Sequence, residues 1–343
     1  MNKILIIRLS SLGDIVLTSP LVRSLRSRFP RAQIDFLVKE QYADLVKFNP
    51  NLSSVIEMRL GDWDELQTLV NQVQSEKYDL LVDLHNSLRS RYIRILSKAR
   101  RRVIVNKRSV ARFMLVNFKW NFYDGIIPVT ERYLETCAPF GPRGDGNGPE
   151  VFIPEQTIET MVSYVSKFKL ERYKLVFGFA PSAKHFTKRW LPERFIELGA
   201  YAAKELNAKV IIFGGKEEAT ACEDISQMIN MQVGAPASES VAGKISLIES
   251  IALLDYCQLV VSNDSGMMHL AQARNRNLVA VFGSTVKEFG FFPTTSNSKV
   301  LEASEVKCRP CSHIGRAECP KGHFNCMNSI RVEEVVAAVR SLL

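Results

Sequence analysis

The segment SNDSGMMH, Ser262–His269, joins an apolar strand to a helix and contains residue types suited to binding a phosphate. The helix is predicted to begin near Met267, so that backbone amides of its first turn and the Ser265 hydroxyl can meet an anion. Asp264 or Ser265 can equally be a simple N-cap, and His269 a core residue. The segment therefore favours a phosphate site only in combination with other residues.

The loop SAKHFTKRW combines hydroxyl and cationic side chains directly after the predicted strand VFGFA. Such a combination suits a diphosphate, because the negative charge that grows on a leaving phosphate must be neutralised where it forms. A solvated basic loop is the alternative interpretation. The side chains in question are Ser182, Lys184, Thr187, Lys188 and Arg189.

A third strand ends in FGGKEE, whose glycines allow close backbone approach. Glu217 or Glu218 can accept hydrogen bonds from a ribose diol, as acidic residues do in nucleotide-binding sheets. The glycine-rich spacings of phosphate-binding ATPases and of dinucleotide-binding oxidoreductases are both absent from the sequence. ATP hydrolysis and hydride transfer are therefore disfavoured.

Asp14 is the first acidic residue of the chain and follows the first predicted strand, in RLSSLGD. A carboxylate in the first turn of a helix is commonly just favourable to the helix dipole. A carboxylate at a strand end that faces a cleft is also suited to act as a general base toward an incoming hydroxyl. The spacing alone leaves both interpretations open.

Four of the seven cysteines lie in CRPCSHIGRAECPKGHFNC, at Cys308, Cys311, Cys319 and Cys326. The spacer of the first pair resembles a structural zinc knuckle, whereas the later spacing departs from the common paired pattern. Reduced or packed thiols are the alternative. No phosphate or base motif adjoins these thiols, so we expect them to take no part in catalysis.

The net charge of +9 is unevenly distributed, because no acidic residue occurs from His85 to Tyr123 while ten cations accumulate between Arg89 and Arg112. An anion-binding surface and a solvated basic face are both compatible with this run. Neither a secretory signal nor an apolar stretch near the roughly 18 residues of a membrane span is present. An odd number of cysteines also suits a reducing compartment, so we expect a cytoplasmic protein.

Short runs rich in Val and Ile alternate with helix-length amphipathic segments, such as DWDELQTLVNQVQSE at 62–76. This alternation over 343 residues predicts an α/β protein with two Rossmann-like parallel-sheet domains that face each other across a cleft. A stretch rich in Gly and Pro, 139–154, marks the linker between them. The predicted parts are domains 1–150 and 151–330 and a C-terminal helix at 331–343. Ligands of such sheets bind beyond the carboxyl ends of the strands, where the candidate residues lie.

Together these segments resemble the bacterial ADP-heptose:lipopolysaccharide heptosyltransferase family, from the first strand to about residue 330. The resemblance is carried by RLSSLGDIVLTSPLVRSLR, DLHNSLRS, KRWLPERF, SNDSGMMHLAQA and the cysteine segment. It implies an inverting glycosyltransferase of the GT-B fold that requires no metal for catalysis. The first domain would bind a lipopolysaccharide core acceptor, and the second an ADP-heptose donor.

The resemblance also implies roles for individual residues. Asp14 would be the general base that deprotonates the acceptor hydroxyl, and Lys188 would hold the donor phosphates. The donor-binding residues are expected to be Ser182, Lys188, Glu217, Glu218, Asp264, Ser265, Gly266 and His269. The acceptor-binding residues are expected to be Ser11, Gly13, Asn86, Arg89 and Arg91, with Arg94 as a further candidate.

An acceptor built of lipid A and acidic sugars is polyanionic and lies at a membrane surface, which gives the basic run a role. The arginines at 100–102 would attract anionic lipid, so peripheral association with the inner membrane is expected. No nucleic-acid partner is expected, because the chain lacks a recognisable reading helix, zinc finger or aromatic sheet motif. A transferase for another activated sugar and a sugar-nucleotide epimerase are the alternative functions, although the epimerase needs no cationic acceptor surface.

Overall fold

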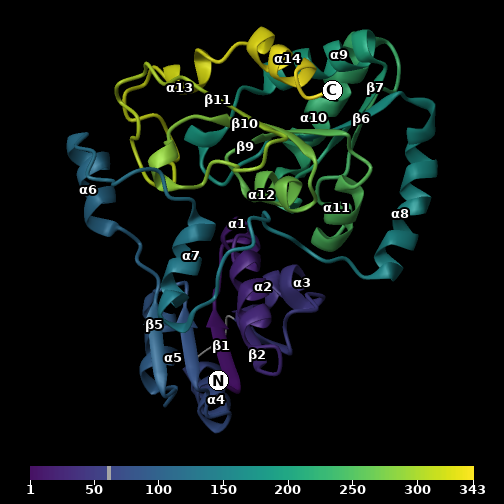
Figure 1. Ribbon diagram of the computed structural model, residues 1–343. Helices are drawn as coiled ribbons and strands as arrows, with labels where there is room; N and C mark the ends of the chain where they lie inside the picture. The colour runs from purple at the N-terminus through teal and green to yellow at the C-terminus, as the bar shows by residue number, and fades with distance from the viewer. Residues whose placement is uncertain (60–62) are drawn as a thin grey trace. The chain divides into compact units, whose positions relative to one another are not determined.

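The computed structural model describes residues 1–59 and 63–343, which form two compact units (Figure 1). The first unit consists of Met1–Ser109 and Ile127–Phe152, and the second of Val110–Ile126 and Ile153–Leu343. Each unit is built on a parallel sheet with helices between successive strands. The predicted fold class, two α/β domains with parallel sheets, is confirmed.

The first unit contains a parallel sheet in the order β3-β2-β1-β4-β5. Its strands are β1 (Lys3–Ile7), β2 (Gln33–Lys39), β3 (Ser54–Met58), β4 (Leu80–Asp83) and β5 (Arg101–Ile104). Its helices are α1 (Leu12–Val16), α2 (Ser19–Arg28), α3 (Asp44–Lys47), α4 (Trp63–Ser75), α5 (Leu88–Leu96) and α7 (Val129–Cys137). The central strand β1 is a run of apolar residues because a parallel sheet is covered on both faces.

Two local expectations for the first unit concern helix starts. Pro20 predicts that the first helical segment restarts near Ser19 or kinks there. The structure has a separate helix, α2, that begins at Ser19 with Pro20 in its first turn. The helix expected at 62–76 is α4, and its first expected residue, Asp62, lies outside the described residues.

The second unit contains a parallel sheet in the order β11-β10-β9-β6-β7-β8. Its strands are β6 (Leu175–Ala180), β7 (Ala208–Ile212), β8 (Ser238–Ser240), β9 (Leu259–Asn263), β10 (Asn277–Phe282) and β11 (Ser298–Glu302). Its helices are α8 (Glu155–Phe168), α9 (Pro192–Leu206), α10 (Ala219–Val233), α11 (Leu247–Leu254), α12 (Gly266–Ala273), α13 (Asn325–Asn328) and α14 (Val332–Arg340). The two edge strands, β8 and β11, are not predicted by the sequence patterns.

The units differ from the predicted domains in three respects. Residues 110–126, which include most of helix α6 (Ser109–Phe118), belong to the second unit and not to the first. Helix α14 is not a separate part, because Val335 and Val339 are fully buried in the same core as strands β9 and β10. The main division falls between Phe152 and Ile153, two residues beyond the predicted boundary.

Each sheet has a switch point, where strands are added first on one side of a starting strand and then on the other. It lies between β1 and β4 in the first sheet and between β6 and β9 in the second. Ligands of open parallel sheets bind beyond the carboxyl ends of the strands at this point. The loops to inspect are therefore those that follow β1, β4, β6 and β9.

No helix among the described residues is both long and apolar enough to cross a membrane.

Helix α14 should contribute directly to the stability of the second unit. Replacing Val335 and Val339 together by Ala leaves cavities in a closed core, which should lower the free energy of unfolding by about 2–4 kcal/mol. Urea denaturation measures this difference. The exposed change Ala337→Ser on the same helix is the control, and an equally small effect of both variants would contradict the packing of α14.

Candidate active site

Asp14 lies on α1, directly beyond the end of β1, and three side chains of the first unit contact its carboxylate. Arg8 Nη2 lies 2.6 Å from Asp14 Oδ1, and the Ser11 hydroxyl donates to Oδ2 at 2.6 Å. The Tyr133 hydroxyl donates to Oδ1 at 3.5 Å. A cation and two hydroxyl donors favour the ionised carboxylate. The Asp14 side chain is 17% exposed, so it remains within reach of a substrate.

Arg8 links the ends of β1 and β4 at the switch point of the first sheet. Its Nη1 donates to the Leu84 carbonyl oxygen, while its guanidinium lies 5.8 Å from the centre of the Tyr133 ring. Burial lowers the pKa of Arg8, but Asp14 and neighbouring groups more than offset this, so that the pKa is raised. Arg8 is therefore a permanent cation that fixes the orientation of the Asp14 carboxylate.

The turn after β4 is organised by Asp83, which is fully buried. Asp83 Oδ1 accepts hydrogen bonds from the backbone amides of His85 and Asn86, at 3.0 and 2.7 Å. Its other oxygen, Oδ2, accepts from Arg94 Nη1. Arg94 is only 7% exposed and neutralises this buried carboxylate, which disfavours its predicted role as an acceptor contact. 

The other predicted acceptor residues lie around the same two strand ends. Ser11 is exposed and caps α1, whereas Gly13 is buried within that helix. Asn86 is half-buried and has a positive φ of 45°, a conformation that asparagine tolerates better than most residues. Arg89 and Arg91, on α5, are both exposed. The two exposed arginines are thus available to an anion, and their role in acceptor binding stays a prediction.

His85 is a neighbour of this site that the sequence analysis does not single out. The pKa of His85 is lowered to about 4, chiefly by burial and in part by the nearby cations Arg8 and Lys107. Its ring is therefore neutral at physiological pH. The only signal in the sequence is its position, two residues beyond a strand end in DLHNSLRS.

In the second unit, the ends of three adjacent strands meet through Lys188, Asp264 and Thr285. Lys188 follows β6, Asp264 follows β9 and Thr285 follows β10. Lys188 Nζ lies 2.6 Å from Asp264 Oδ2, and the Thr285 hydroxyl donates to the same oxygen at 2.6 Å. The Lys188 and Asp264 side chains are 16% and 7% exposed. The ion pair thereby holds the Lys188 ammonium at the carboxyl edge of the sheet.

Asn263 holds the basic loop against β9, a role that the sequence analysis misses. Its Nδ2 donates to the Pro181 carbonyl oxygen at 2.6 Å, and its Oδ1 accepts from the Trp190 amide at 3.0 Å. Both ends of the loop that contains Lys188 are thus tied to one fully buried side chain. A polar residue at the end of an apolar strand was the available signal.

The start of α12 bears on the two interpretations of the SNDSG segment: a phosphate site, or an N-cap followed by a core histidine. Ser265 is the N-cap residue, but its side chain makes no capping hydrogen bond, and its Oγ lies 3.3 Å from Ser262 Oγ. Gly266 is the first helical residue. His269 is 4% exposed, with its ring 6.2 Å from the Phe291 ring centre, which favours its interpretation as a core residue.

The remaining predicted donor residues occupy the ends of β6 and β7. Ser182 is half-buried, with its Oγ 3.8 Å from Cys222 Sγ. Glu218 Oε2 accepts from the Gly215 amide at 2.6 Å, so one of its oxygens stabilises its own turn. Glu217 is exposed and projects from the same turn, which makes it the more available carboxylate of the two.

The four cysteines of the predicted zinc site are free thiols. Cys308 Sγ lies 3.8 Å from His323 Nε2, and burial raises the pKa of Cys326 to about 11. Within the described part of the chain, no group of three or more His, Cys, Asp or Glu side chains is placed to hold a metal ion. The zinc site at Cys308, Cys311, Cys319 and Cys326 stays a prediction, without support from this geometry.

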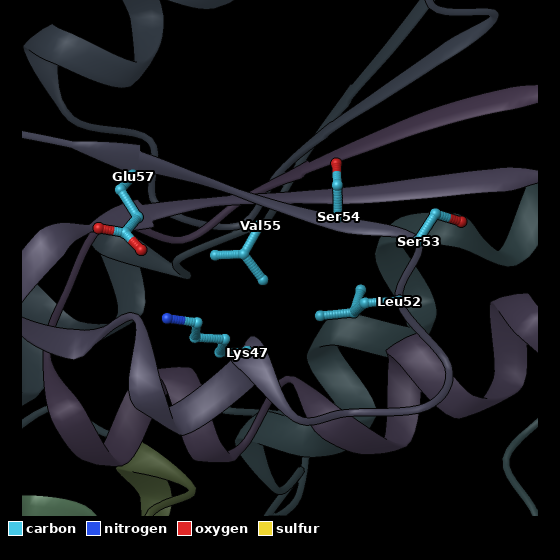
Figure 2. Close-up of a pocket in the computed structure, with 6 residues that line it drawn as sticks. All are labelled: Lys47, Leu52, Ser53, Ser54, Val55 and Glu57. Carbon is cyan, nitrogen blue, oxygen red and sulfur yellow. The ribbon is translucent and has the colours of Figure 1, made fainter.

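A small pocket of the first unit lies elsewhere. Figure 2 shows that it is formed where α3 meets the edge strand β3, with Lys47 and Glu57 among its lining side chains. The rest of the lining is Leu52, Ser53, Ser54 and Val55. No predicted site residue is among these six, so the pocket adds nothing to the candidate active site.

The sequence matches the family model of Glycosyltransferase family 9 (heptosyltransferase) over residues 66–321. The chain belongs to this family. It is 29% identical to lipopolysaccharide heptosyltransferase 2 of Escherichia coli, a match that covers 99% of the chain and 98% of the relative. It is 30% identical to lipooligosaccharide heptosyltransferase 2 of Haemophilus influenzae over 89% of the chain and 91% of that relative.

Solved structures of family members share the fold. A glycosyl transferase family 9 protein from Veillonella parvula has a TM-score of 0.81 and 21% identity, with 99% of this chain and 97% of that chain covered. The ADP-heptose heptosyltransferase II of E. coli has a TM-score of 0.77 and 24% identity, with 99% and 98% covered. The predicted family and the predicted enzyme class, a glycosyltransferase, are confirmed, and the epimerase alternative is not favoured.

The depressed pKa of His85 predicts a pH dependence of stability. The unfolded chain takes up a proton at His85 near pH 6.5, whereas the folded chain does so only near pH 4. The free energy of unfolding should therefore fall as the pH drops through this window, by roughly 1–2 kcal/mol after allowance for solvent screening. The variant His85→Gln should lack this component. Urea denaturation of both proteins at several pH values measures it, and parallel pH profiles would contradict the assignment.

Proposed function

We propose that the protein is an inverting glycosyltransferase that moves a heptose from ADP-heptose to the inner core of lipopolysaccharide. Membership of family 9 supports glycosyl transfer, and the names of the relatives support this donor and this acceptor. The observation that carries the mechanism is the ionised, partly exposed Asp14 carboxylate at the switch point of the first sheet. In the reaction, an acceptor hydroxyl oxygen bonds to the anomeric carbon, its proton passes to Asp14, and the bond from that carbon to the ADP phosphate breaks.

Asp14 meets the requirements of a general base in this reaction. Its ion pair with Arg8 keeps it ionised, and the Ser11 hydroxyl fixes the second oxygen. Arg8 keeps its charge when Asp14 takes up the proton, and its guanidinium still donates to the Leu84 carbonyl oxygen. Ser11 contacts the carboxylate and Asn86 follows the neighbouring strand β4, and both are proposed to position the acceptor hydroxyl.

The second unit supplies the groups that suit the leaving nucleotide. ADP gains negative charge as the sugar departs, so an ammonium held in place before the reaction lowers the barrier. Lys188, oriented by Asp264, is proposed to contact the diphosphate together with Ser182, the Ser265 hydroxyl and the first amides of α12. Glu217, or Glu218 through its second oxygen, would bind the ribose. These groups neutralise the diphosphate without a metal ion, so we propose that catalysis needs none.

The acceptor explains the exposed cations of the first unit. Arg89 and Arg91 would contact the acidic sugars or phosphates of a lipopolysaccharide core, since bidentate arginine contacts suit such anions. Arg101 and Arg102, on the edge strand β5, are also exposed and would attract anionic lipid. The protein would therefore work in the cytoplasm, at the surface of the inner membrane.

Replacing Asp14 by Asn removes the proposed base but keeps the size of the side chain. Turnover should fall by about 100-fold or more, while the affinity for ADP stays close to that of the native protein. Turnover is measured by mass spectrometry, as the gain of one heptose by a truncated lipopolysaccharide. The exposed change Asp44→Asn is the control. Full activity of Asp14→Asn would exclude Asp14 as the base, and no mass gain by the native protein would overturn the proposed reaction.

Lys188 should contribute to nucleotide affinity. Lys188→Ala removes a charge-assisted contact with the diphosphate, so the dissociation constant for ADP should rise about tenfold. Lys188→Arg should retain most of the affinity, and Lys204→Ala, a change at an exposed position on α9, should leave it unaltered. Isothermal titration calorimetry measures all four proteins. Equal affinities would place the diphosphate elsewhere.

A further inference from the structure

The segment Val110–Ile126, here called the aromatic segment, exposes large apolar side chains to solvent. Only Leu115 is buried along α6, which provides much of the segment (Figure 1). The exposed side chains, with their exposed fractions, are Val110 (77%), Phe113 (58%), Phe118 (52%), Trp120 (57%), Phe122 (63%) and Ile126 (50%). Soluble proteins seldom expose a contiguous apolar surface of this kind unless it binds a partner.

The aromatic segment is a structured surface and not a loose loop. Its rings contact one another in succession, with centre distances of 6.0 Å for Phe113 and Phe118, 5.5 Å for Phe118 and Trp120, and 6.5 Å for Trp120 and Phe122. Lys119 Nζ ties the segment to the rest of the second unit by donating to the Pro310 carbonyl oxygen at 2.5 Å. The rings are thus presented together from a fixed backbone.

Cations lie beside Lys119, within the aromatic segment. Arg316 Nε donates to the Cys311 carbonyl oxygen at 2.9 Å, next to the Pro310 carbonyl oxygen that Lys119 contacts. The pKa of Lys119 is lowered chiefly by burial, with Arg316 and Lys321 among the charges that lower it and the thiols of Cys311 and Cys308 acting in the opposite direction. Arg316 and Lys321 are both exposed, although they lie about 200 positions from Lys119 in the sequence. Two carboxylates are also close: Asp124 belongs to the segment itself, and Glu288 Oε1 accepts a hydrogen bond from Asn121 Nδ2 at 3.4 Å. The fold has therefore brought cations from another segment close to Lys119, which lies between Phe118 and Trp120 in the sequence.

We propose that the aromatic segment docks on the surface of an anionic phospholipid bilayer. Aromatic rings, tryptophan above all, favour the level of the lipid headgroups, and neighbouring cations attract anionic lipid. A second copy of the chain fits less well, because a twofold contact through this surface would bring the cations of both copies together. The inference rests on the proposed function in one respect: docking on a bilayer would bring the enzyme to an acceptor that is anchored there by its lipid.

The proposal is tested by sedimentation with vesicles of phosphatidylcholine alone or of phosphatidylcholine mixed with phosphatidylglycerol. The native protein should bind the mixed vesicles, and much less protein should bind the neutral ones. The combined change Phe118→Ser, Trp120→Ser and Phe122→Ser should weaken this binding about tenfold or more. Ile158→Ser with Val162→Ser, on α8, removes comparably exposed apolar groups and should leave binding unchanged.

Two further experiments separate the contribution of charge to vesicle binding from that of apolar contact. Lys321→Glu should weaken binding to the mixed vesicles, whereas Lys204→Glu, an equal charge change on α9, should have a much smaller effect. In a Trp63→Phe background the remaining tryptophans are Trp120 and the buried Trp190. The emission of Trp120 should then shift to shorter wavelength when mixed vesicles are added, because its ring leaves water.

The outcomes distinguish this inference from the proposed function. All variants should bind ADP with native affinity, which also shows that they are folded. Native vesicle binding by the triple serine variant would overturn the docking proposal, as would an unchanged Trp120 emission. Loss of a dimer in sedimentation velocity, without any difference on vesicles, would assign the surface to self-association instead. Failure of heptosyl transfer with intact vesicle binding would reject the proposed reaction and leave the docking surface standing.

Discussion

The parallel pairing of strands is the constraint on which both candidate sites depend. It brings the carboxyl ends of β1 and β4 together in one sheet, and those of β6, β9 and β10 in the other. Charged side chains gathered at such an edge lose part of their hydration, so each must have a partner. The pairs Arg8 with Asp14 and Lys188 with Asp264 meet this need while leaving each functional group partly exposed. The same contacts therefore serve both stability and chemistry.

The sheets could be predicted because buried parallel strands are short runs of apolar residues. Strand β8 escapes this pattern, since its three residues, SES, include no apolar one. Strand β11 is a partly buried edge strand and gives only a weak signal. The membership of 110–126 in the second unit could not be predicted either. An apolar stretch shows that a segment can be buried, but it does not show which sheet the segment accompanies.

The site could be predicted only for residues whose position along the chain, just after a strand, also decides their place in the fold. Asp14, Lys188 and Asp264 follow strand ends, and the order of strands in a parallel sheet brings such residues together. Arg94 and Arg91 cannot be told apart by spacing, since the burial of Arg94 follows from its pairing with Asp83. Thr285 and Asn263 gain their roles from contacts between neighbouring loops. Such contacts require the order of β10, β9 and β6, which the sequence patterns do not contain.

The passage of the chain between units at three points, after Ser109, Ile126 and Phe152, has a practical consequence for dissecting the enzyme. A fragment cut at the main division would carry α6 and its rings without the Pro310 carbonyl that anchors Lys119. The other fragment would lack Tyr123, whose ring centre lies 6.5 Å from that of Phe289. Separately produced halves would each expose apolar surface and tend to precipitate, whereas a genetic rearrangement that returns 110–126 to the later half would keep the contacts within each unit together.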